Sequence, residues 1–199
     1  MECILFLPEY DEHFKEWGWD YQVSKLEKSL KHFEERGLAL DIGAHVGIWT
    51  YNLQNHFDEV IAFEPQSENF ECFNKNVDAT VHNVALGSHE GEVKLENPLE
   101  DNSGGWEVRE GKGITLKTLD SFNLKPDFIK IDVQGYELEV LKGSIETLKH
   151  TQALIIEVMN NASGKMIHNK KIEPFMNDHG FVIAEKIRKD HVYVRNYDN

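Results

Sequence analysis

A glycine-containing turn follows the first long apolar run of the chain. The run 38–42 leads into Asp41-Ile42-Gly43-Ala44-His45-Val46-Gly47, and a segment that suits a helix comes next. Glycine at such a strand-to-helix turn lets the backbone bend tightly and approach a ligand. A dinucleotide fingerprint also needs glycine two residues after the first one, where this chain has His45. The turn therefore predicts a ligand site and disfavours a nicotinamide oxidoreductase.

A carboxylate stands at the end of the next apolar run. Glu64 follows the run 59–63 and lies 21 residues after Gly43. A carboxylate at this place can accept hydrogen bonds from both hydroxyls of a ribose. Glu64 alone is equally consistent with an ordinary solvated side chain, but together with the glycine turn it predicts a nucleoside site.

A second group of charged residues surrounds the end of the run 127–133. Lys130 lies inside this apolar run, so its ammonium needs a partner or a cleft. Asp132, two residues on, points to the same face of a strand and can be that partner. Glu137 follows at the start of the next predicted helix. These residues predict either a reactive site at the same sheet edge as Gly43, or a structural ion pair with Glu137 capping a helix.

The chain around these residues has a specific pattern. Residues 129–143 read IKIDVQGYELEVLKG, and residues 40–47 read LDIGAHVG. Shorter motifs accompany them, namely Phe63-Glu64-Pro65, Asn83-Val84-Ala85-Leu86-Gly87, Asn102-Ser103-Gly104-Gly105, Thr118-Leu119-Asp120 and Ile156-Glu157-Val158. Over residues 38–158 the chain thereby resembles the FkbM family of S-adenosylmethionine (SAM) methyltransferases. The family usually has Glu at the position of Gln134 and often Asn at that of His45, and both departures bear on the charge of the site.

The resemblance implies a SAM-dependent enzyme that methylates a hydroxyl of a small molecule, sugar or glycan. The residues implied for the cofactor are Asp41, Gly43, Ala44, His45, Gly47, Glu64, Asn83 and Ala85. The implied catalytic group has Asp132 as the base that takes the hydroxyl proton, with Lys130 and Glu137 positioning it and the substrate. The loop residues Asn102, Ser103, Gly104 and Trp106 suit a sugar acceptor, or form an ordinary hairpin tip. The alternative function is a regulatory module that binds SAM or a nucleotide without catalysis.

The elements that must position these residues alternate between strands and helices. Apolar runs predict strands at 38–42, 59–63, 80–86, 127–133 and 153–158, and helical patterns cover 20–36, 48–55, 67–77, 137–149 and 167–179. This alternation predicts an α/β, Rossmann-like fold with a mostly parallel central sheet and helices on both faces. Alternating segments at 91–96 and 114–119 predict a β insertion, and 181–186 with 191–197 predict a C-terminal antiparallel hairpin. We expect an N-terminal helical segment, 1–37, and one methyltransferase domain, 38–199.

Composition narrows the range of partners. The 199 residues carry 21 basic and 35 acidic side chains, a net charge of −14, so nucleic acid is not an expected substrate. Two cysteines cannot build a disulfide framework, and no run approaches the ~20 apolar residues of a membrane-spanning helix. We expect a cytoplasmic protein with a small-molecule or carbohydrate acceptor and no membrane partner. No metal is expected, because the histidines are scattered and Asp132 with Glu157 is only a minor candidate pair. The acceptor and the oligomeric state stay open.

Overall fold

A seven-stranded sheet forms the centre of the molecule, in the order β10-β11-β9-β8-β1-β2-β3. The structure is a computed structural model that describes residues 4–158 and 165–197. The strands of this sheet are β1 (Leu38–Ile42), β2 (Glu59–Phe63), β3 (Thr80–His82), β8 (Phe128–Ile131), β9 (Ala153–Glu157), β10 (Phe181–Ile187) and β11 (Asp190–Arg195). Strand β11 runs antiparallel to both β9 and β10, and the other neighbouring strands pair in parallel. The predicted parallel sheet with a C-terminal antiparallel hairpin is confirmed.

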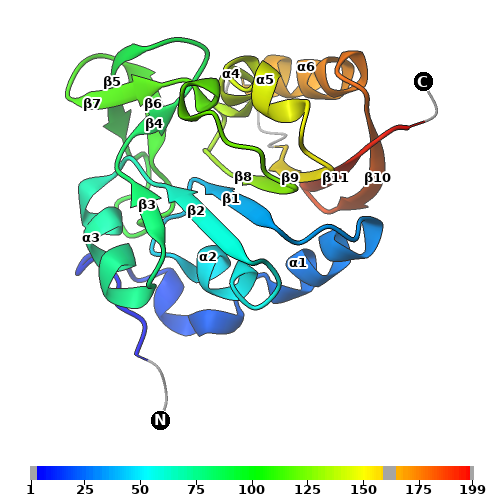
Figure 1. Ribbon diagram of the computed structural model, residues 1–199. Coiled ribbons are helices and arrows are strands. Elements are labelled where there is room, and N and C mark those ends of the chain that lie inside the picture. The colour runs from blue at the N-terminus through cyan, green and yellow to red at the C-terminus, as the bar shows by residue number, and fades with distance from the viewer. Residues whose placement is uncertain (1–3, 159–164, 198–199) are drawn as a thin grey trace.

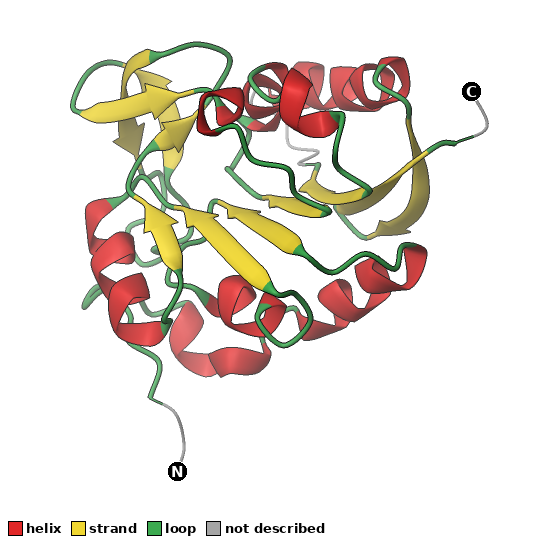
Figure 2. Ribbon diagram, viewed as in Figure 1, coloured by secondary structure: helices red, strands yellow, loops and turns green. Residues whose placement is uncertain are grey.

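Helices cover both faces of this sheet (Figures 1 and 2). On one face lie α1 (Val23–Ser29), α2 (Ile48–Leu53) and α3 (Ser67–Asn76), and on the other lie α4 (Glu137–Lys142), α5 (Ile145–Leu148) and α6 (Lys165–Asp178). Strands β8 and β9 are buried along their whole length because both faces are covered, which explains their continuous apolar runs. Within the described ranges no helix is both long enough and apolar enough to cross a membrane.

A second, four-stranded sheet has the order β4-β7-β5-β6 and lies near the end of β3 (Figure 1). Its strands are β4 (Ala85–Leu86), β5 (Gly91–Glu96), β6 (Glu107–Glu110) and β7 (Ile114–Lys117). The run 80–86, predicted as one strand, is divided between the two sheets, because its first part pairs with β2 and its last part with β7. Strand β6 has no counterpart among the predicted elements. The insertion carries the loop 97–106, which joins β5 to β6.

The helix predicted over 137–149 is interrupted at Gly143. A Cβ atom on Gly143 would lie 2.0 Å from the carbonyl oxygen of Gly87, so the two backbones are in direct contact there. Gly143 also accepts a hydrogen bond from the backbone N–H of Asp120, at 3.0 Å. The chain therefore ends α4 at this contact and starts α5 after it.

The helix predicted over 20–36 is shorter than expected. It comprises α1 and a single 3-10 turn, residues 30–32, and then the backbone becomes extended at Phe33. The guanidinium of Arg36 donates to the carbonyl oxygens of Leu30 and Phe33, at 2.8 and 2.9 Å. These bonds satisfy carbonyl groups that the end of a helix leaves without a partner.

The N-terminal segment, residues 4–22, runs from α3 to the loop 97–106. The amide of Asn76 in α3 holds Phe6 through two hydrogen bonds of 2.8 Å. Phe14 is buried against residues of the glycine turn and of α2, and the backbone N–H of Glu12 donates to the carbonyl of Asp101 at 3.0 Å. The segment thus meets the insertion near the carboxyl ends of the central strands. The division into domains at residue 37 stays a prediction.

Candidate active site

Two adjoining cavities open at the carboxyl ends of β1 and β8. Counted together with the space open to solvent at their mouths, the first spans about 560 Å³ and the second about 740 Å³. Their walls share Gly43, His45, Gly104, Asp132 and Gln134. The cavities therefore meet above the glycine turn, at the sheet edge where open α/β sheets bind their ligands.

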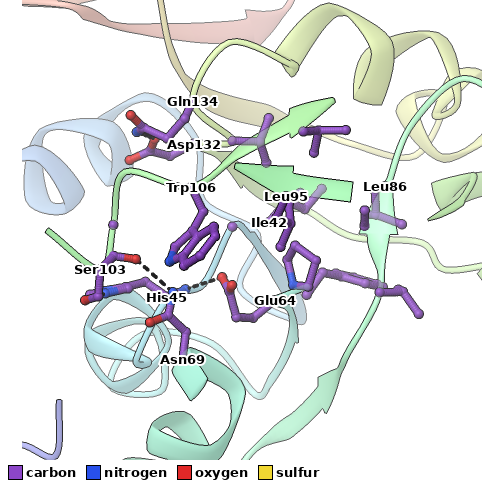
Figure 3. A pocket seen from close by; sticks show the side chains of 18 residues that line it. Ile42, His45, Glu64, Asn69, Leu86, Leu95, Ser103, Trp106, Asp132 and Gln134 are labelled. Atoms are coloured by element: carbon purple, nitrogen blue, oxygen red, sulfur yellow. Dashed lines mark hydrogen bonds between the residues drawn. The ribbon is translucent and has the colours of Figure 1, made fainter. Parts of the chain in front are cut away.

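The first cavity combines an apolar wall with the carboxyl groups of Glu64, which follows β2, and Asp132, which follows β8 (Figure 3). Its apolar lining includes Ile42, Phe63, Val84, Ala85, Leu86 and Trp106. Glu64 lies on the other side of His45 from the loop residue Ser103. Among the described residues that line it there is neither lysine nor arginine. Such a wall suits an aromatic base and a ribose better than a pyrophosphate.

The second cavity has aromatic rings and many hydrogen-bonding groups. The N-terminal segment contributes His13, Phe14 and Tyr21, and the loop 97–106 contributes Asn102. Lys130, Asp132, Glu157 and Lys189 add charged or ionisable groups, and Ala44 lies at the turn. Ring faces beside amide and charged groups are suited to a polyhydroxy ligand.

Contacts with its backbone hold the glycine turn in place, and the turn also lines the cavities. Gly43 has φ +76°, and a Cβ atom there would lie 1.9 Å from the carbonyl oxygen of Asp132. The ammonium of Lys130 donates to the carbonyl oxygen of Gly43 at 2.6 Å. Gly47, with φ +96°, precedes α2 and faces Val77 rather than a cavity. Gly43 is thus required because the backbone of Asp132 lies against it. Gly47 is required because the side chains of Val77 and Phe73 pack against it.

Asp41 lies beneath the site instead of lining it. It is fully buried, and it stands directly beside Lys130 in the parallel pairing of β1 with β8. Its Oδ1 lies 2.9 Å from the Lys130 ammonium, and its Oδ2 accepts from the Thr50 hydroxyl at 2.7 Å. The ion pair of Lys130 is therefore with Asp41, where the spacing in the sequence pointed to Asp132. Burial acts to lower the pKa of Lys130, but Asp41 and Asp132 outweigh it, so this pKa lies above its usual range.

Glu64 connects the end of β2 to the glycine turn. Its two oxygens accept from the backbone N–H groups of His45 and Gln66, at 2.8 and 2.9 Å. Burial raises the pKa of Glu64 to about 7, and these hydrogen bonds oppose the rise. Asn83 does not line either cavity; its exposed amide donates to the backbone carbonyl of Glu64 at 2.8 Å. Asn83 therefore supports the carboxylate rather than bordering a ligand.

Asp132 belongs to a cluster that the sequence analysis only partly anticipated. Asp132 and Glu157 share a hydrogen bond, and the amide of Gln134 donates to both, at 2.7 and 3.0 Å. Lys189, in the turn between β10 and β11, forms an ion pair with Glu157. Gln134 has φ +55°, a left-handed conformation that is uncommon for a residue with a side chain.

The two carboxyl groups of this cluster have different protonation behaviour. Burial acts to raise the pKa of Asp132, but Lys130 and hydrogen bonds from Glu157 and Gln134 outweigh it, and the pKa lies below its usual range. Burial, followed by the charge of Asp132, raises the pKa of Glu157 to about 8. Glu157 therefore takes up a proton more readily than Asp132 does. Nothing in the sequence indicated Lys189, because the turn that holds it is distant in the chain, and Gln134 was marked only as a residue that bears on the charge of the site.

Glu137 stabilises the turn that follows β8. It is buried, and its Oε1 accepts from the backbone N–H groups of Gly135 and Val133, at 2.8 and 3.3 Å. Burial raises its pKa to about 7. Glu137 lines neither cavity, so the structure places it as a support for the residues between Asp132 and α4.

The loop 97–106 is fastened to the site by Ser103. Its carbonyl accepts from the Asn69 amide at 2.9 Å, and its Oγ lies 2.6 Å from Nε2 of His45 (Figure 3). Asp11 of the N-terminal segment binds both the backbone N–H and the hydroxyl of Ser103. The indole N–H of Trp106 donates to the Tyr10 hydroxyl at 3.0 Å. The loop predicted to face an acceptor thus lies at the site, and Asp11 is a residue that sequence reasoning missed.

The structure brings most of the predicted residues to one place. The cavities are lined by Gly43, Ala44, His45, Glu64, Ala85, Asn102, Ser103, Gly104, Trp106, Lys130 and Asp132. Asp41, Gly47, Asn83 and Glu137 lie behind these residues. Across residues 4–158 and 165–197, no three or more His, Cys, Asp or Glu side chains are arranged to hold a metal ion.

The chain matches a known protein family over most of its length. A model of the FkbM methyltransferase domain matches residues 41–183. The hexuronic acid methyltransferase AglP of Haloferax volcanii is 30% identical over 142 residues, which make up 65% of this chain and 59% of that protein. The chain thus spans less than two thirds of the length of this relative.

Solved structures share the fold. The methyltransferase FkbM of Methylobacillus flagellatus KT superposes with a TM-score of 0.57 at 20% identity, over 81% of this chain and 44% of that one. The magnesium protoporphyrin IX methyltransferase of Synechocystis PCC 6803, solved with bound SAM, gives a TM-score of 0.52 at 14% identity, over 89% and 79%. At these identities the likeness shows the Rossmann-like methyltransferase fold alone, and the family follows from the match over residues 41–183. This chain belongs to the FkbM methyltransferase family.

Proposed function

We propose that this chain transfers a methyl group from SAM to a hydroxyl of a carbohydrate acceptor. The observation that carries the proposal is the meeting of the two cavities at Gly43, His45 and Asp132. A group transfer needs both reactants at one point in the right orientation, and two cavities with a common wall provide such a point. The first cavity would take the cofactor and the second the acceptor.

The lining of the first cavity fits SAM. The rings of Trp106 and Phe63 and their apolar neighbours suit an adenine, and Glu64 suits the ribose hydroxyls. SAM has no phosphate group, in keeping with a described lining that lacks lysine and arginine. Its sulfonium is positive, and the carboxylate of Asp132 stands where the cavities meet. When bound, SAM supplies an electrophilic methyl group to the oxygen of the acceptor.

Asp132 would take the proton of the acceptor hydroxyl. Its lowered pKa keeps it ionised at neutral pH, so it can accept a proton at once. Glu157 supplies the hydrogen of the bond between the two carboxyl groups, and Gln134 fixes their separation. A carboxylate of low pKa is a weak base, so we expect alignment and exclusion of water to contribute most of the rate enhancement.

The acceptor we propose is a hexuronic acid unit, alone or within a glycan. The second cavity offers the rings of Phe14 and Tyr21 to a sugar face and the amide of Asn102 to its hydroxyls. The side chain of Lys189 is 52% exposed, and its ammonium can pair with a carboxylate of the acceptor. The name of the relative from Haloferax volcanii supports the same class of sugar.

Two measurements test this function. Calorimetric titration with SAM, its demethylated product and NADH should give micromolar binding of the first two and none of NADH. Methyl transfer from radiolabelled SAM should then be faster to p-nitrophenyl β-D-glucuronide than to the matching glucoside. Absence of SAM binding would refute the cofactor assignment. Binding of SAM without transfer to any hydroxyl would instead favour the regulatory module.

A further inference from the structure

A line of hydrogen bonds connects the N-terminal segment to the junction of the two cavities. The carboxylate of Asp11 accepts from the backbone N–H of Ser103 at 2.8 Å and also from its hydroxyl. The same hydroxyl oxygen lies 2.6 Å from Nε2 of His45. Asp11 and Ser103 are fully buried, so water does not compete for these bonds. Figure 3 shows His45 between Ser103 and Glu64.

The chemistry of the three groups sets the direction of each bond. A carboxylate has no hydrogen to donate, so the Ser103 hydroxyl gives its single hydrogen to Asp11. The Ser103 oxygen then offers His45 only lone pairs, and Nε2 of His45 must carry the hydrogen between them. A neutral imidazole has one N–H, which leaves Nδ1 as a bare acceptor. Burial, opposed by the charge of Asp11, lowers the pKa of His45 to about 4, so the ring is neutral at physiological pH.

The bare nitrogen of His45 faces available space. Among the described residues no hydrogen bond to Nδ1 is found. His45 is only partly buried, and its Nδ1 is not among the inaccessible polar atoms, so the cavities can reach it. His45 lines both cavities. Its backbone has φ +54°, and such a conformation in a residue with a side chain is found preferentially at functional sites.

A hydroxyl group has one hydrogen to donate. In the function proposed above, the reacting hydroxyl gives that hydrogen to Asp132, so Nδ1 of His45 needs a different donor. We propose that Asp11 and Ser103 hold His45 as the Nε2–H tautomer, so that its Nδ1 accepts a hydrogen bond from a second hydroxyl next to the methylated one. The acceptor is then a vicinal diol, a feature that sugars and hexuronic acids have. His45 contacts the acceptor, whereas Asp11 and Ser103 are positioning residues. This inference rests on the proposed function only for the identity of the ligand.

Nitrogen-15 NMR of the imidazole groups reads the tautomer directly in the full chain without cofactor. The wild type should show Nε2–H for His45. In Asp11→Ala no carboxylate remains to accept from the Ser103 hydroxyl, so Ser103 can donate to Nε2 and the Nδ1–H form should become populated. The control is Asp101→Ala, which removes a carboxylate from an exposed residue of the loop that carries Ser103 and should leave the tautomer unchanged.

Two results of this experiment overturn the proposal. They are an Nδ1–H form in the wild type and an unchanged tautomer in a folded Asp11→Ala variant. Should Asp11→Ala fail to fold, Ser103→Ala keeps the backbone bond to Asp11 and removes only the hydroxyl. We expect both tautomers in that variant, and a spectrum identical to the wild type overturns the role of Ser103.

Ligands distinguish the acceptor from the cofactor as the partner of Nδ1. Titration with the demethylated product of SAM should leave the Nδ1 resonance unchanged, and a shift typical of an accepted hydrogen bond would assign the atom to the cofactor instead. With p-nitrophenyl β-D-glucuronide, Asp11→Ala should raise KM up to about tenfold, the loss of one hydrogen bond, with a smaller change in kcat. An unchanged KM overturns the proposal. If the wild type does not methylate the glucuronide, the proposed function fails, while the NMR spectra still decide how His45 is held.

Discussion

Replacing Lys130 by Met tests the ion pair that supports the glycine turn. Methionine has a similar length but no charge, so Lys130→Met removes the ammonium 2.9 Å from Asp41 and 2.6 Å from the Gly43 carbonyl. Asp41 keeps its hydrogen bond to the Thr50 hydroxyl. Because Asp41 is fully buried, water cannot replace the lost partner. The variant therefore leaves a buried carboxylate that is only partly compensated.

The expected cost follows from these contacts. Removing one partner of a buried ion pair destabilises a fold by ~3–5 kcal/mol. The lost hydrogen bond to the Gly43 carbonyl adds ~1 kcal/mol, for a total of ~4–6 kcal/mol. Domains have ~5–15 kcal/mol of stability in all, so this is a large fraction. At ~2–4 °C for each kcal/mol in a chain of this size, Tm should fall by ~8–24 °C.

Urea unfolding followed by circular dichroism measures this loss. The control is Lys142→Met, which breaks an ion pair with Glu139 on a helix surface, where Lys142 is 45% exposed. An exposed pair contributes only ~0–1 kcal/mol. The double variant Asp41→Asn with Lys130→Met should recover most of the loss, because it leaves no buried charge. A cost for Lys130→Met no larger than that of the control, or no recovery in the double variant, would show that the reasoning is wrong.

Three further outcomes are expected. Asp132→Asn should abolish methyl transfer while SAM affinity, measured by calorimetry, stays within a few fold; unchanged turnover removes Asp132 from the mechanism. Glu64 binds a proton more tightly in the folded protein, where its pKa is about 7, than at its ordinary pKa of 4.5. Its contribution to stability therefore falls as the pH rises through that range, and Glu64→Gln should flatten the plot of the free energy of unfolding in urea against pH. A slope equal to that of the wild type contradicts this assignment. Gly43→Ala places a Cβ atom 1.9 Å from the carbonyl oxygen of Asp132, so it should lower the free energy of unfolding by more than ~2 kcal/mol and eliminate SAM binding. A variant that binds SAM as tightly as the wild type would show that the cofactor does not depend on this turn.

Local sequence patterns were sufficient for the topology and for the sheet edge at which the two cavities open. The alternation of apolar runs with helical patterns determines a parallel sheet, because crossovers between parallel strands are right-handed and need helices. In such a sheet the carboxyl ends of the strands share one edge, which places Gly43, Glu64 and Asp132 together. These predictions use only the order of elements along the chain, and they are therefore insensitive to errors in the length of each helix.

The supporting contacts could not be predicted in the same way, because they depend on register and on distant segments. The partner of Lys130 is Asp41 on the neighbouring strand, and the pairing register that aligns them is invisible in a single sequence. Asn83 and Glu137 occur within motifs, but their side chains bind backbone groups, and a motif does not indicate which backbone group a side chain will bind. Asp11 lies in an acidic segment without a motif, and its partner is 92 residues away.

Contacts around the two cavities join residues that are far apart in the sequence. Asp11 and Ser103 are separated by 92 residues, and Lys130 and Gly43 by 87. Closing loops of this length costs conformational entropy before any contact forms, which slows folding steps that depend on distant pairs. The pairing of β1 with β8 closes a loop of similar length, so we expect both this pairing and the junction of Asp11 with Ser103 to form after the more local pairing of β1 with β2.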